Sequence, residues 1–308
     1  MSELMDEPLV AETLMAETPV HGALPARPAT DTRRATCRRV ARLAVRSLYA
    51  ELALYPKPGL VSLVDNGSHA DMTAATFMRS LFALRRYFAD ITAAGMDDAP
   101  FAVLKRLGIA AEARMLRATG GINTHRGAIF CLGLLCAAIG RCHAGSVPFE
   151  PTAIRAMLLA RWGRDLGAHR VDAGGASHGA QVRLRHAAGG ARDEGARGFP
   201  SLFEVGLPAL RVALRAGRGL RAARIDALFA LMAHISDTNV YHRGGADGAR
   251  TVRRMARAFV ARGGTAAPDW QARALACHRA FVAARLSPGG AADLLGAVCL
   301  LHAVCGLE

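Results

Sequence analysis

Apolar residues recur at intervals of three and four positions along most of the chain, which is the spacing of an α-helix with one buried face. The first helix is predicted to begin near Thr32 and to end before Pro56, because proline disfavours helical geometry in the residue before it. Its apolar face holds Val40, Leu43, Leu48 and Leu52. A second helix, capped by Asp71 or Thr73, carries an apolar face of Phe77, Leu81, Leu84, Phe88 and Ile91.

Proline and glycine mark the ends of the later helices. Pro100 lies in the first turn of the third predicted helix, and Gly120 ends it. Further helices are predicted over residues 127–142, 151–167, 200–216, 222–235, 246–262, 269–286 and 290–305. No continuous run rich in Val and Ile suggests a strand, and the dominant residues Ala, Leu and Arg favour helices. We therefore predict an all-α protein, with a single compact domain of nine or ten helices over 33–308 and a disordered acidic tail over 1–32.

The charge of the chain is divided unevenly between the tail and the rest. Residues 1–32 hold six acidic side chains, one basic side chain and four prolines, without a sustained helical period. The whole chain has a net charge of +14, so the remaining residues carry a net +19. Such a field attracts polyanions, and nucleic acid and a nucleotide triphosphate are the two candidates. The alternative is that most arginines form only a solvated surface.

Cysteine usage and the apolar segments indicate a cytoplasmic protein. None of the seven cysteines forms a CxxC pair, which argues against a zinc knuckle, and several lie inside apolar helical runs. Buried, reduced thiols fit this pattern best. We expect no membrane partner, because no signal peptide is visible and the longest apolar run, 128–140, is shorter than the ~20 residues that a membrane span needs.

Glycine and polar side chains are concentrated in a few loops between these helices, at 55–72, 119–127, 172–200, 236–247 and 286–292. In the loop 55–72, Lys57 lies between two prolines, where a lysine provides a point charge for phosphate. Asp65, His69 and Asp71 follow and are candidate ligands for Mg²⁺. The alternative is a polar turn formed by Asp65 and Asn66, with Asp71 as a helix cap.

The other loops contain further candidates. Before the apolar helix, the loop 119–127 places Asn123, His125 and Arg126 where a helix N-terminus could hold an anion, unless Asn123 only caps a connecting turn. His178 is either a ligand-binding group or an ordinary histidine, and Asp193 and Glu194 follow it. The loop 236–247 offers Asp237, Asn239, His242 and Arg243. Asp293 follows a Pro-Gly-Gly turn at the start of the last helix.

Six motifs in these loops occur in one order: "PKPGLV…DNGSHADM…TF..S" (56–80), "GGINTHRGAIF" (120–130), "SHG" (177–179), "GAR.E…GFP" (190–200), "DTN…HRGG" (237–245) and "SPGGAADLL" (287–295). Together they resemble the all-helical triphosphoribosyl-dephospho-CoA synthase family over about residues 35–305. The resemblance implies a transferase that joins ATP to 3′-dephospho-CoA and releases adenine. Its product would be the precursor of the prosthetic group of an acyl carrier protein, in citrate lyase or malonate decarboxylase.

One position departs from the pattern that the resemblance implies. The family pattern has Thr-His-Gly followed by Glu, whereas Ser177-His178-Gly179 is followed here by Ala180. A catalytic carboxylate at that position is therefore missing, and Glu194 is the nearer acid.

The reaction itself defines the roles that the candidate residues would fill. Breaking the N-glycosidic bond builds positive charge at the ribose C1′, which carboxylates stabilise, while an acid protonates adenine and a base deprotonates the attacking hydroxyl. Candidates for these catalytic roles are Glu51, Asp65, Asp71 and Glu194. Candidates for substrate binding are Lys57, Asn66, His69, Asn123, His125, Arg126, His178, Asp237, Asn239 and Arg243. Asp65 and Asp71 would hold Mg²⁺, which would neutralise charge on the intact triphosphate.

Two other functions remain open from the residues alone. A Mg²⁺-dependent helical hydrolase of a nucleotide or ADP-ribose-type substrate would use the same loops with water as the acceptor. A basic nucleic-acid-binding protein would use the net positive charge, but aromatic residues are only 6% of the chain and no known binding module is visible, so we expect no nucleic-acid partner. For the transferase, we expect the product to pass to a carrier-protein-modifying transferase. Malonate decarboxylase is favoured over citrate lyase because no carrier-transferase segment is fused to the chain.

Overall fold

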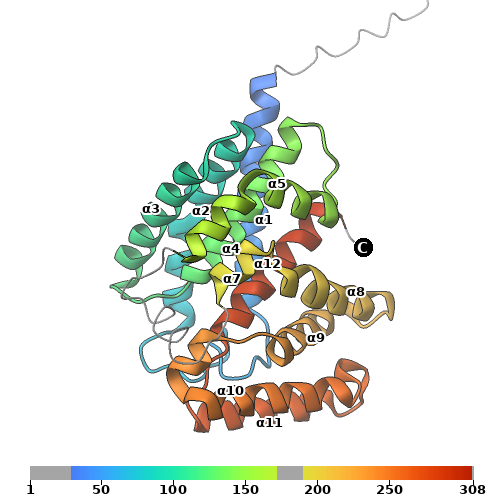
Figure 1. The fold of residues 1–308 in the computed structure, drawn as a ribbon. Helices are drawn as coiled ribbons and strands as arrows, with labels where there is room; N and C mark the ends of the chain where they lie inside the picture. The colour runs from blue at the N-terminus through green and yellow to red at the C-terminus, as the bar shows by residue number, and fades with distance from the viewer. Residues whose placement is uncertain (1–28, 172–189, 307–308) are drawn as a thin grey trace, which may run out of the picture.

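The computed structural model describes residues 29–171 and 190–306, and all regular elements in these ranges are helical (Figure 1). There are eleven α-helices in the described residues, of which ten have seven or more residues, and no strand. The predicted all-α class is confirmed. The helices are α1 (Ala29–Leu52), α2 (Ala74–Met96), α3 (Phe101–Thr119), α4 (Arg126–Ala144), α5 (Pro151–Val171), α7 (Ala191–Ala196), α8 (Leu207–Arg215), α9 (Gly219–His234), α10 (Thr238–Ala261), α11 (Trp270–Ala283) and α12 (Gly289–Cys305).

Local sequence signals set several of these boundaries as predicted. The side chain of Thr73, rather than that of Asp71, caps α2 by accepting a hydrogen bond from the N–H of Thr76. Helix α3 begins directly after Pro100 and ends at Gly120, which adopts the left-handed conformation with φ 70°. The apolar faces predicted for α1 and α2 are buried, except that Leu43 and Phe77 are only partly buried.

Several boundaries differ from the prediction; helix α5, for example, ends at Val171 instead of 167. Helix α1 begins at Ala29, so residues 29–32 of the predicted tail are helical, while residues 1–28 lie outside the described part of the chain. The expected loop 170–200 contains the short helix α7. Helix α10 begins at Thr238 instead of 246, because the side chain of Asp237 caps it, and the predicted glycine break appears only as a kink at Gly245.

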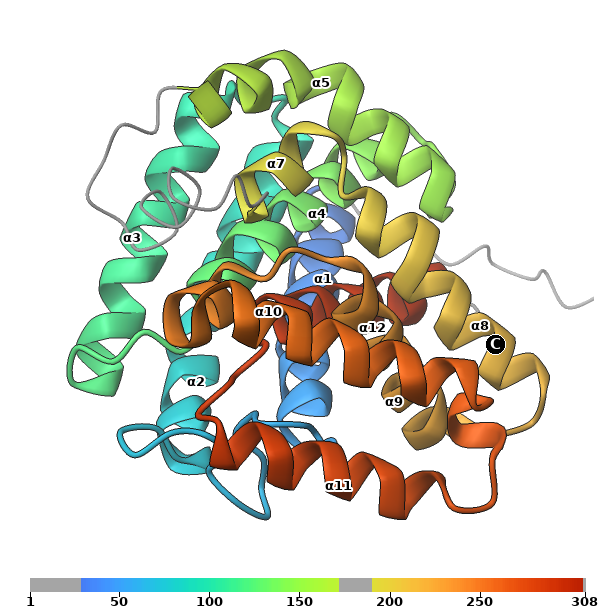
Figure 2. The same cartoon turned by 60° about the horizontal axis from the view of Figure 1, so that its bottom comes forward.

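Helices α4 and α12 lie at the centre of the molecule, with α1 and α2 packed beside them (Figures 1 and 2). Helix α4 is long and apolar enough to cross a membrane by length and composition, but 72% of its apolar window is buried inside the fold, as in the core helix of a soluble protein. Helices α10 and α11 lie together near the loop that joins α1 to α2. This arrangement brings the N-termini of α4, α10 and α12 to one side of the core.

Candidate active site

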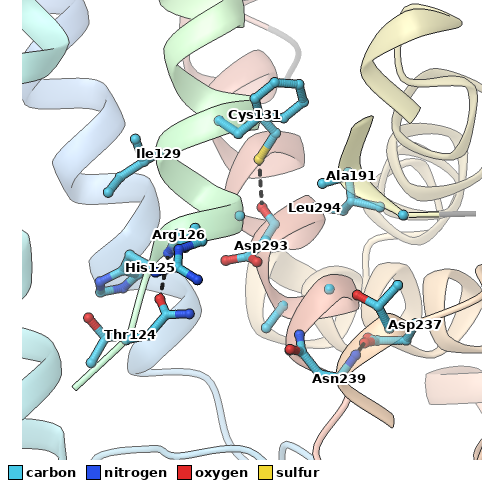
Figure 3. Close-up of a pocket in the computed structure, with 18 of the residues that line it drawn as sticks. Thr124, His125, Arg126, Ile129, Cys131, Ala191, Asp237, Asn239, Asp293 and Leu294 are labelled. Carbon is cyan, nitrogen blue, oxygen red and sulfur yellow. Dashed lines mark hydrogen bonds between the residues drawn. The ribbon is translucent and has the colours of Figure 1, made fainter. Parts of the chain in front are cut away.

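A cavity of about 1310 Å³ opens where these helix ends meet (Figure 3). Its lining comes from the end of α1, the loop 53–73, parts of α2 and α3, the loop 121–125, the N-terminal parts of α4, α10 and α12, and α7. A pocket for one small ligand usually has a volume of roughly 300–1,000 Å³. The cavity therefore has room for more than one ligand of ordinary size. Most of the residues that the sequence predicted as site residues line it.

Glu51 and Lys57 form a buried ion pair in the cavity wall. The Lys57 ammonium donates to the Glu51 carboxylate at 2.5 Å and to the carbonyl oxygen of the same residue at 2.9 Å, so it also caps the C-terminus of α1. Their side chains are only 5% and 1% exposed, respectively. Burial raises the pKa of Glu51 and lowers that of Lys57, and each partner opposes the shift of the other. The predicted phosphate-binding lysine is thus held by a carboxylate of its own chain.

The loop 53–73 is fixed against the segment that joins α11 to α12. The Ser68 hydroxyl donates to the carbonyl oxygen of Leu286 at 2.6 Å. Gly59 has φ 68°, and a side chain there would collide with the same carbonyl group, so the close approach requires glycine. These contacts make the loop a rigid wall of the cavity.

His69 joins this loop to α10 and lines the cavity. Its Nδ1 accepts a hydrogen bond from the Arg243 guanidinium at 2.8 Å, so its Nε2 carries the proton and donates to the Ser287 hydroxyl at 2.8 Å. Burial, together with Arg243, lowers the pKa of His69 to about 4. At neutral pH, His69 is an uncharged group that orients Arg243 at the cavity.

The predicted grouping of Asp65 with His69 and Asp71 is not formed. Asp65 and Asn66 do not line the cavity. The Asp65 carboxylate accepts from the N–H of Gly67 at 2.8 Å and lies 3.3 Å from Nε2 of His278, as expected for a turn residue. Asp71 lines the cavity, with a side chain that is 62% exposed.

The positions of Asp65 and Asp71 therefore do not support the predicted Mg²⁺ site. Across residues 29–171 and 190–306, no group of three His, Cys, Asp or Glu side chains is placed to share a metal ion. A magnesium ion held by Asp65 and Asp71 stays a prediction that the geometry does not favour.

His125 presents an unsatisfied nitrogen at the cavity, at the position before α4. Its side chain is buried, its Nδ1 is hydrogen-bonded to the Ser80 hydroxyl at 2.7 Å, and its Nε2 has no hydrogen-bond partner in the described structure. Burial, with the Lys57 charge as a second cause, lowers the pKa of His125 to about 3. Because a buried polar atom without a partner is costly, a bound ligand that pairs with Nε2 would remove that cost.

Asn123 and Arg126 lie at the same end of α4. The Asn123 side-chain oxygen accepts from the backbone N–H of Arg126 at 3.2 Å, which is the capping role that was the alternative to ligand binding. The Arg126 guanidinium pairs with Glu112 of α3 at 3.1 Å and is 46% exposed. Arg126 therefore remains accessible to an anion at the cavity mouth.

Asp237 is held by the N-termini of two helices. Its carboxylate accepts from the N–H of Asn239 at 2.9 Å in α10 and from the N–H of Ala291 at 3.1 Å in α12. Burial raises its pKa to about 6, although these backbone donors, with those of Val240 and Gly290, favour the ionised form. Asp237 was predicted to bind substrate, and the structure places it in the cavity as a buried carboxylate with several donors. Asn239 lines the cavity beside it.

Asp293 also lines the cavity and was not among the predicted site residues. It belongs to the first turns of α12 and faces the N-terminus of α4, where the N–H of Ala128 donates to its carboxylate. A side chain at Gly127 would collide with this carboxylate, so the two helices approach closely here. No Lys, Arg or His of the described chain pairs with Asp293. Burial, followed by the charges of Glu51 and Asp237, raises its pKa well above the usual range.

Glu194 lines the cavity from α7, but its carboxylate is already engaged. It accepts from the hydroxyl of Ser201 at 2.8 Å and from the N–H of the same residue at 3.1 Å, and it is 14% exposed. This carboxylate ties α7 to the segment that follows. His178 and Ala180 lie outside the described residues.

The cavity thus holds a cluster of carboxyl groups in its interior and mainly basic side chains at its mouth, where the exposed Asp71 also lies. We call Glu51, Asp237 and Asp293 the acidic floor, since Glu51 and Asp237 are buried and Asp293 is half-buried between α12 and α4. The basic rim consists of exposed lining residues, Lys105, Arg126, Arg197 and Arg243. Lys105 and Arg197 were not predicted, because nothing in their local sequence separates them from the many other basic residues of the surface.

Comparisons with known proteins agree with the motifs. The CitG family, described as ATP:dephospho-CoA triphosphoribosyl transferase, matches residues 37–307. A probable 2-(5''-triphosphoribosyl)-3'-dephosphocoenzyme-A synthase of Acinetobacter calcoaceticus is 40% identical over 82% of this chain and 87% of the relative. The 2-(5''-triphosphoribosyl)-3'-dephosphocoenzyme-A synthase of Pectobacterium atrosepticum is 40% identical over 83% of this chain and 86% of the relative. A probable synthase of Pseudomonas aeruginosa is 42% identical over 85% and 89%. No solved structure matches the chain.

Proposed function

The chain belongs to the CitG family of ATP:dephospho-CoA triphosphoribosyl transferases, and from this premise we propose that transfer occurs in the cavity between the acidic floor and the basic rim. The enzyme moves the triphosphoribosyl group of ATP onto dephospho-CoA. Once the triphosphoribosyl group is transferred, adenine is the only part of ATP left over. The bond that breaks is therefore the one between ribose C1′ and the base. The triphosphate itself is carried over intact.

One observation carries this placement: three carboxyl groups from three separate elements meet in a single cavity. Glu51 comes from α1, Asp237 precedes α10 and Asp293 begins α12. Loss of the base gives C1′ the positive character of an oxocarbenium ion, and carboxylates positioned beside it lower the energy of that state. Buried carboxyl groups cost stability in a folded protein, which is why such a cluster is typical of a functional site.

The volume and the rim fit the two substrates. ATP and dephospho-CoA are both polyanionic nucleotides, and the cavity exceeds the usual range for one ligand. Arg126 belongs to α4 and Arg243 to α10, so each can meet a different phosphate group. The unsatisfied Nε2 of His125 lies deeper and would pair with a hydroxyl or a base nitrogen.

We further propose that the product is passed to a carrier-protein-modifying transferase in the cytoplasm, and that the system served is malonate decarboxylase rather than citrate lyase. This extends the preference drawn from the sequence. Its test is to supply the purified product, with the modifying transferase of each system, to both carrier proteins. Equal or greater modification of the citrate lyase carrier would contradict the preference.

The activity in the proposed cavity is tested by incubating the protein with ATP, Mg²⁺ and dephospho-CoA. Free adenine and an acceptor heavier by one triphosphoribosyl group should appear in equal amounts. Adenine release that does not need dephospho-CoA would instead indicate the hydrolase. Tight DNA binding with a steep salt dependence and no adenine release would indicate the nucleic-acid-binding alternative.

The location is tested separately. The Asp237→Asn variant should lose most of the activity while keeping the fold, whereas Asp165→Asn, the same change at an exposed position on α5 outside the cavity, should not. Full activity of Asp237→Asn would place the reaction elsewhere.

A further inference from the structure

The carboxyl groups of the acidic floor have unequal surroundings, although they share one cavity. Glu51 is paired with Lys57 at 2.5 Å. Asp237 has no cation, but it accepts backbone hydrogen bonds from the N-termini of both α10 and α12. Asp293 has a single backbone donor, Ala128, and no cation from the described chain. The three groups therefore differ in how well their surroundings stabilise a negative charge.

We propose that Asp293 is the general acid that protonates the departing adenine, and that Asp237 is the base that accepts the proton of the attacking hydroxyl. This inference rests on the transferase activity and assigns the two proton transfers to residues of the cavity. Glu51, already neutralised by Lys57, takes neither role. Glu51 acts only on Asp293, because its nearby carboxylate raises the pKa of Asp293.

The geometry favours a proton on Asp293. Helix α4 presses against its carboxyl group at Gly127, so no room remains on that side for a cation or for several waters. The groups that face Asp293 are Glu51 of α1, Asp237 ahead of α10 and the Cys131 thiol of α4, which donates to its backbone oxygen at 3.5 Å. None of these groups is positive. Burial disfavours a negative charge on Asp293, and so do the carboxylates of Glu51, even though Lys57 is paired with it, and of Asp237.

The geometry favours the ionised form of Asp237. Backbone N–H groups at the ends of α10 and α12 point at its two oxygens, and helix N-termini stabilise a negative charge. Its pKa of about 6 leaves it mainly ionised at neutral pH, whereas Asp293, with one backbone donor and two carboxylates nearby, has a raised pKa and is the better holder of a proton. Two carboxyl groups whose environments separate their pKa values in this way are the usual arrangement of an acid and a base in one site.

The proposed step balances as follows. The C1′–N9 bond of ATP breaks, and its electron pair goes to the adenine ring while a ring nitrogen takes the proton of Asp293. The hydroxyl oxygen of dephospho-CoA bonds to C1′, and its proton goes to Asp237. Adenine leaves as a neutral base, Asp293 is left ionised and Asp237 protonated. A proton exchange through solvent in the open cavity then restores the starting state.

The test uses the Asp293→Asn variant, which keeps the size of the side chain and an acceptor for the N–H of Ala128. With ATP, its kcat should fall by about 10²–10⁴-fold, the usual contribution of one acid or base. The donor is then changed to N7-methyl-ATP, whose cationic base leaves without protonation. On this donor the variant should approach the wild-type rate. Asp165→Asn is the control, and it should behave as the wild type on both donors.

Each outcome decides one claim. If the wild type releases no adenine from ATP and dephospho-CoA, the result contradicts the proposed transferase activity itself. It then says nothing against Asp293 in particular. If the wild type is active and Asp293→Asn retains its rate, or is equally impaired on both donors, the role of Asp293 is wrong. Should the variant not fold, the wild type alone still decides. Its rate with ATP should fall at high pH as Asp293 loses its proton, and this fall should vanish with N7-methyl-ATP; a fall that persists would overturn the proposal.

Discussion

The ion pair between Glu51 and Lys57 makes a prediction about stability that can be worked out from its geometry. Two unit charges separated by 2.5 Å attract by about 6–7 kcal/mol at an effective dielectric constant of ~20. Desolvation of both groups offsets much of this attraction, so the pair itself adds little. Removing only Lys57 leaves Glu51 buried without a cation, and such a loss usually costs about 3–5 kcal/mol. The Lys57→Met variant should therefore be less stable than the wild type by about that amount at neutral pH.

The measurement is urea unfolding followed by circular dichroism, with the free energies of unfolding compared at one pH. Lys105→Met is the matched control, because Lys105 is the other lysine of the chain and is exposed. Its change should stay within about 0.5 kcal/mol. The double variant Glu51→Gln with Lys57→Met should recover part of the loss, because no buried charge remains.

The pH dependence of the same variant follows from the direction of the pKa shift. The pKa of Glu51 is already raised in the wild type, and in Lys57→Met it rises further above its unfolded value, because burial is no longer opposed by the ammonium. Folding then favours the protonated form, so stability is retained below the unfolded pKa of Glu51 and is lost as the pH rises through its folded pKa. Lys57→Met should thus lie closer to the wild type at pH 5 than at pH 8. An equal loss at both values, or a loss no larger than that of Lys105→Met, would refute the reasoning.

Three further predictions concern the cavity. Gly127→Ala should reduce kcat at least about tenfold by displacing the Asp293 carboxyl group, whereas Gly167→Ala, at an open position on α5, should not; steady-state assays of both variants check this. His125→Phe should raise the KM of at least one substrate, because Nε2 has no partner within the described structure and is available to a ligand; an unchanged KM for both would contradict this role. Since Asp65 and Asp71 form no metal site in the structure, calorimetric titration of the free enzyme with Mg²⁺ should show no saturable binding, and Mg²⁺ should bind only together with ATP.

The helices could be predicted from the sequence because their signals are local. The apolar periods of α1 and α2, the cap at Thr73 and the glycine after α3 depend on residues a few positions apart. The sequence predicts the start of α10 too late, because the glycines at 244 and 245 indicate a loop, whereas the side chain of Asp237 caps the helix seven residues earlier.

The loops that form the cavity could also be predicted, but the contacts of their side chains could not. Asp65 and Asp71 are close in sequence, yet packing of their loop against residues 281–287 turns Asp65 toward His278 and leaves Asp71 exposed. Local density of polar residues does not encode that orientation. Asp293 was noted as the start of a helix but not chosen, although a lone carboxylate in a largely apolar helix was the signal available.

The separation of the acidic floor from the basic rim also bears on how ATP must lie. Its triphosphate is attached at C5′, on the opposite edge of the ribose from C1′, so the two can occupy zones of opposite charge at the same time. Phosphates near the ionised Asp237 would be repelled, whereas at Arg126 and Arg243 they would be attracted. Only C1′, which becomes positive as adenine departs, gains from the floor. The same charges that draw in two polyanions at the rim therefore direct the reacting carbon of ATP toward the buried carboxyl groups.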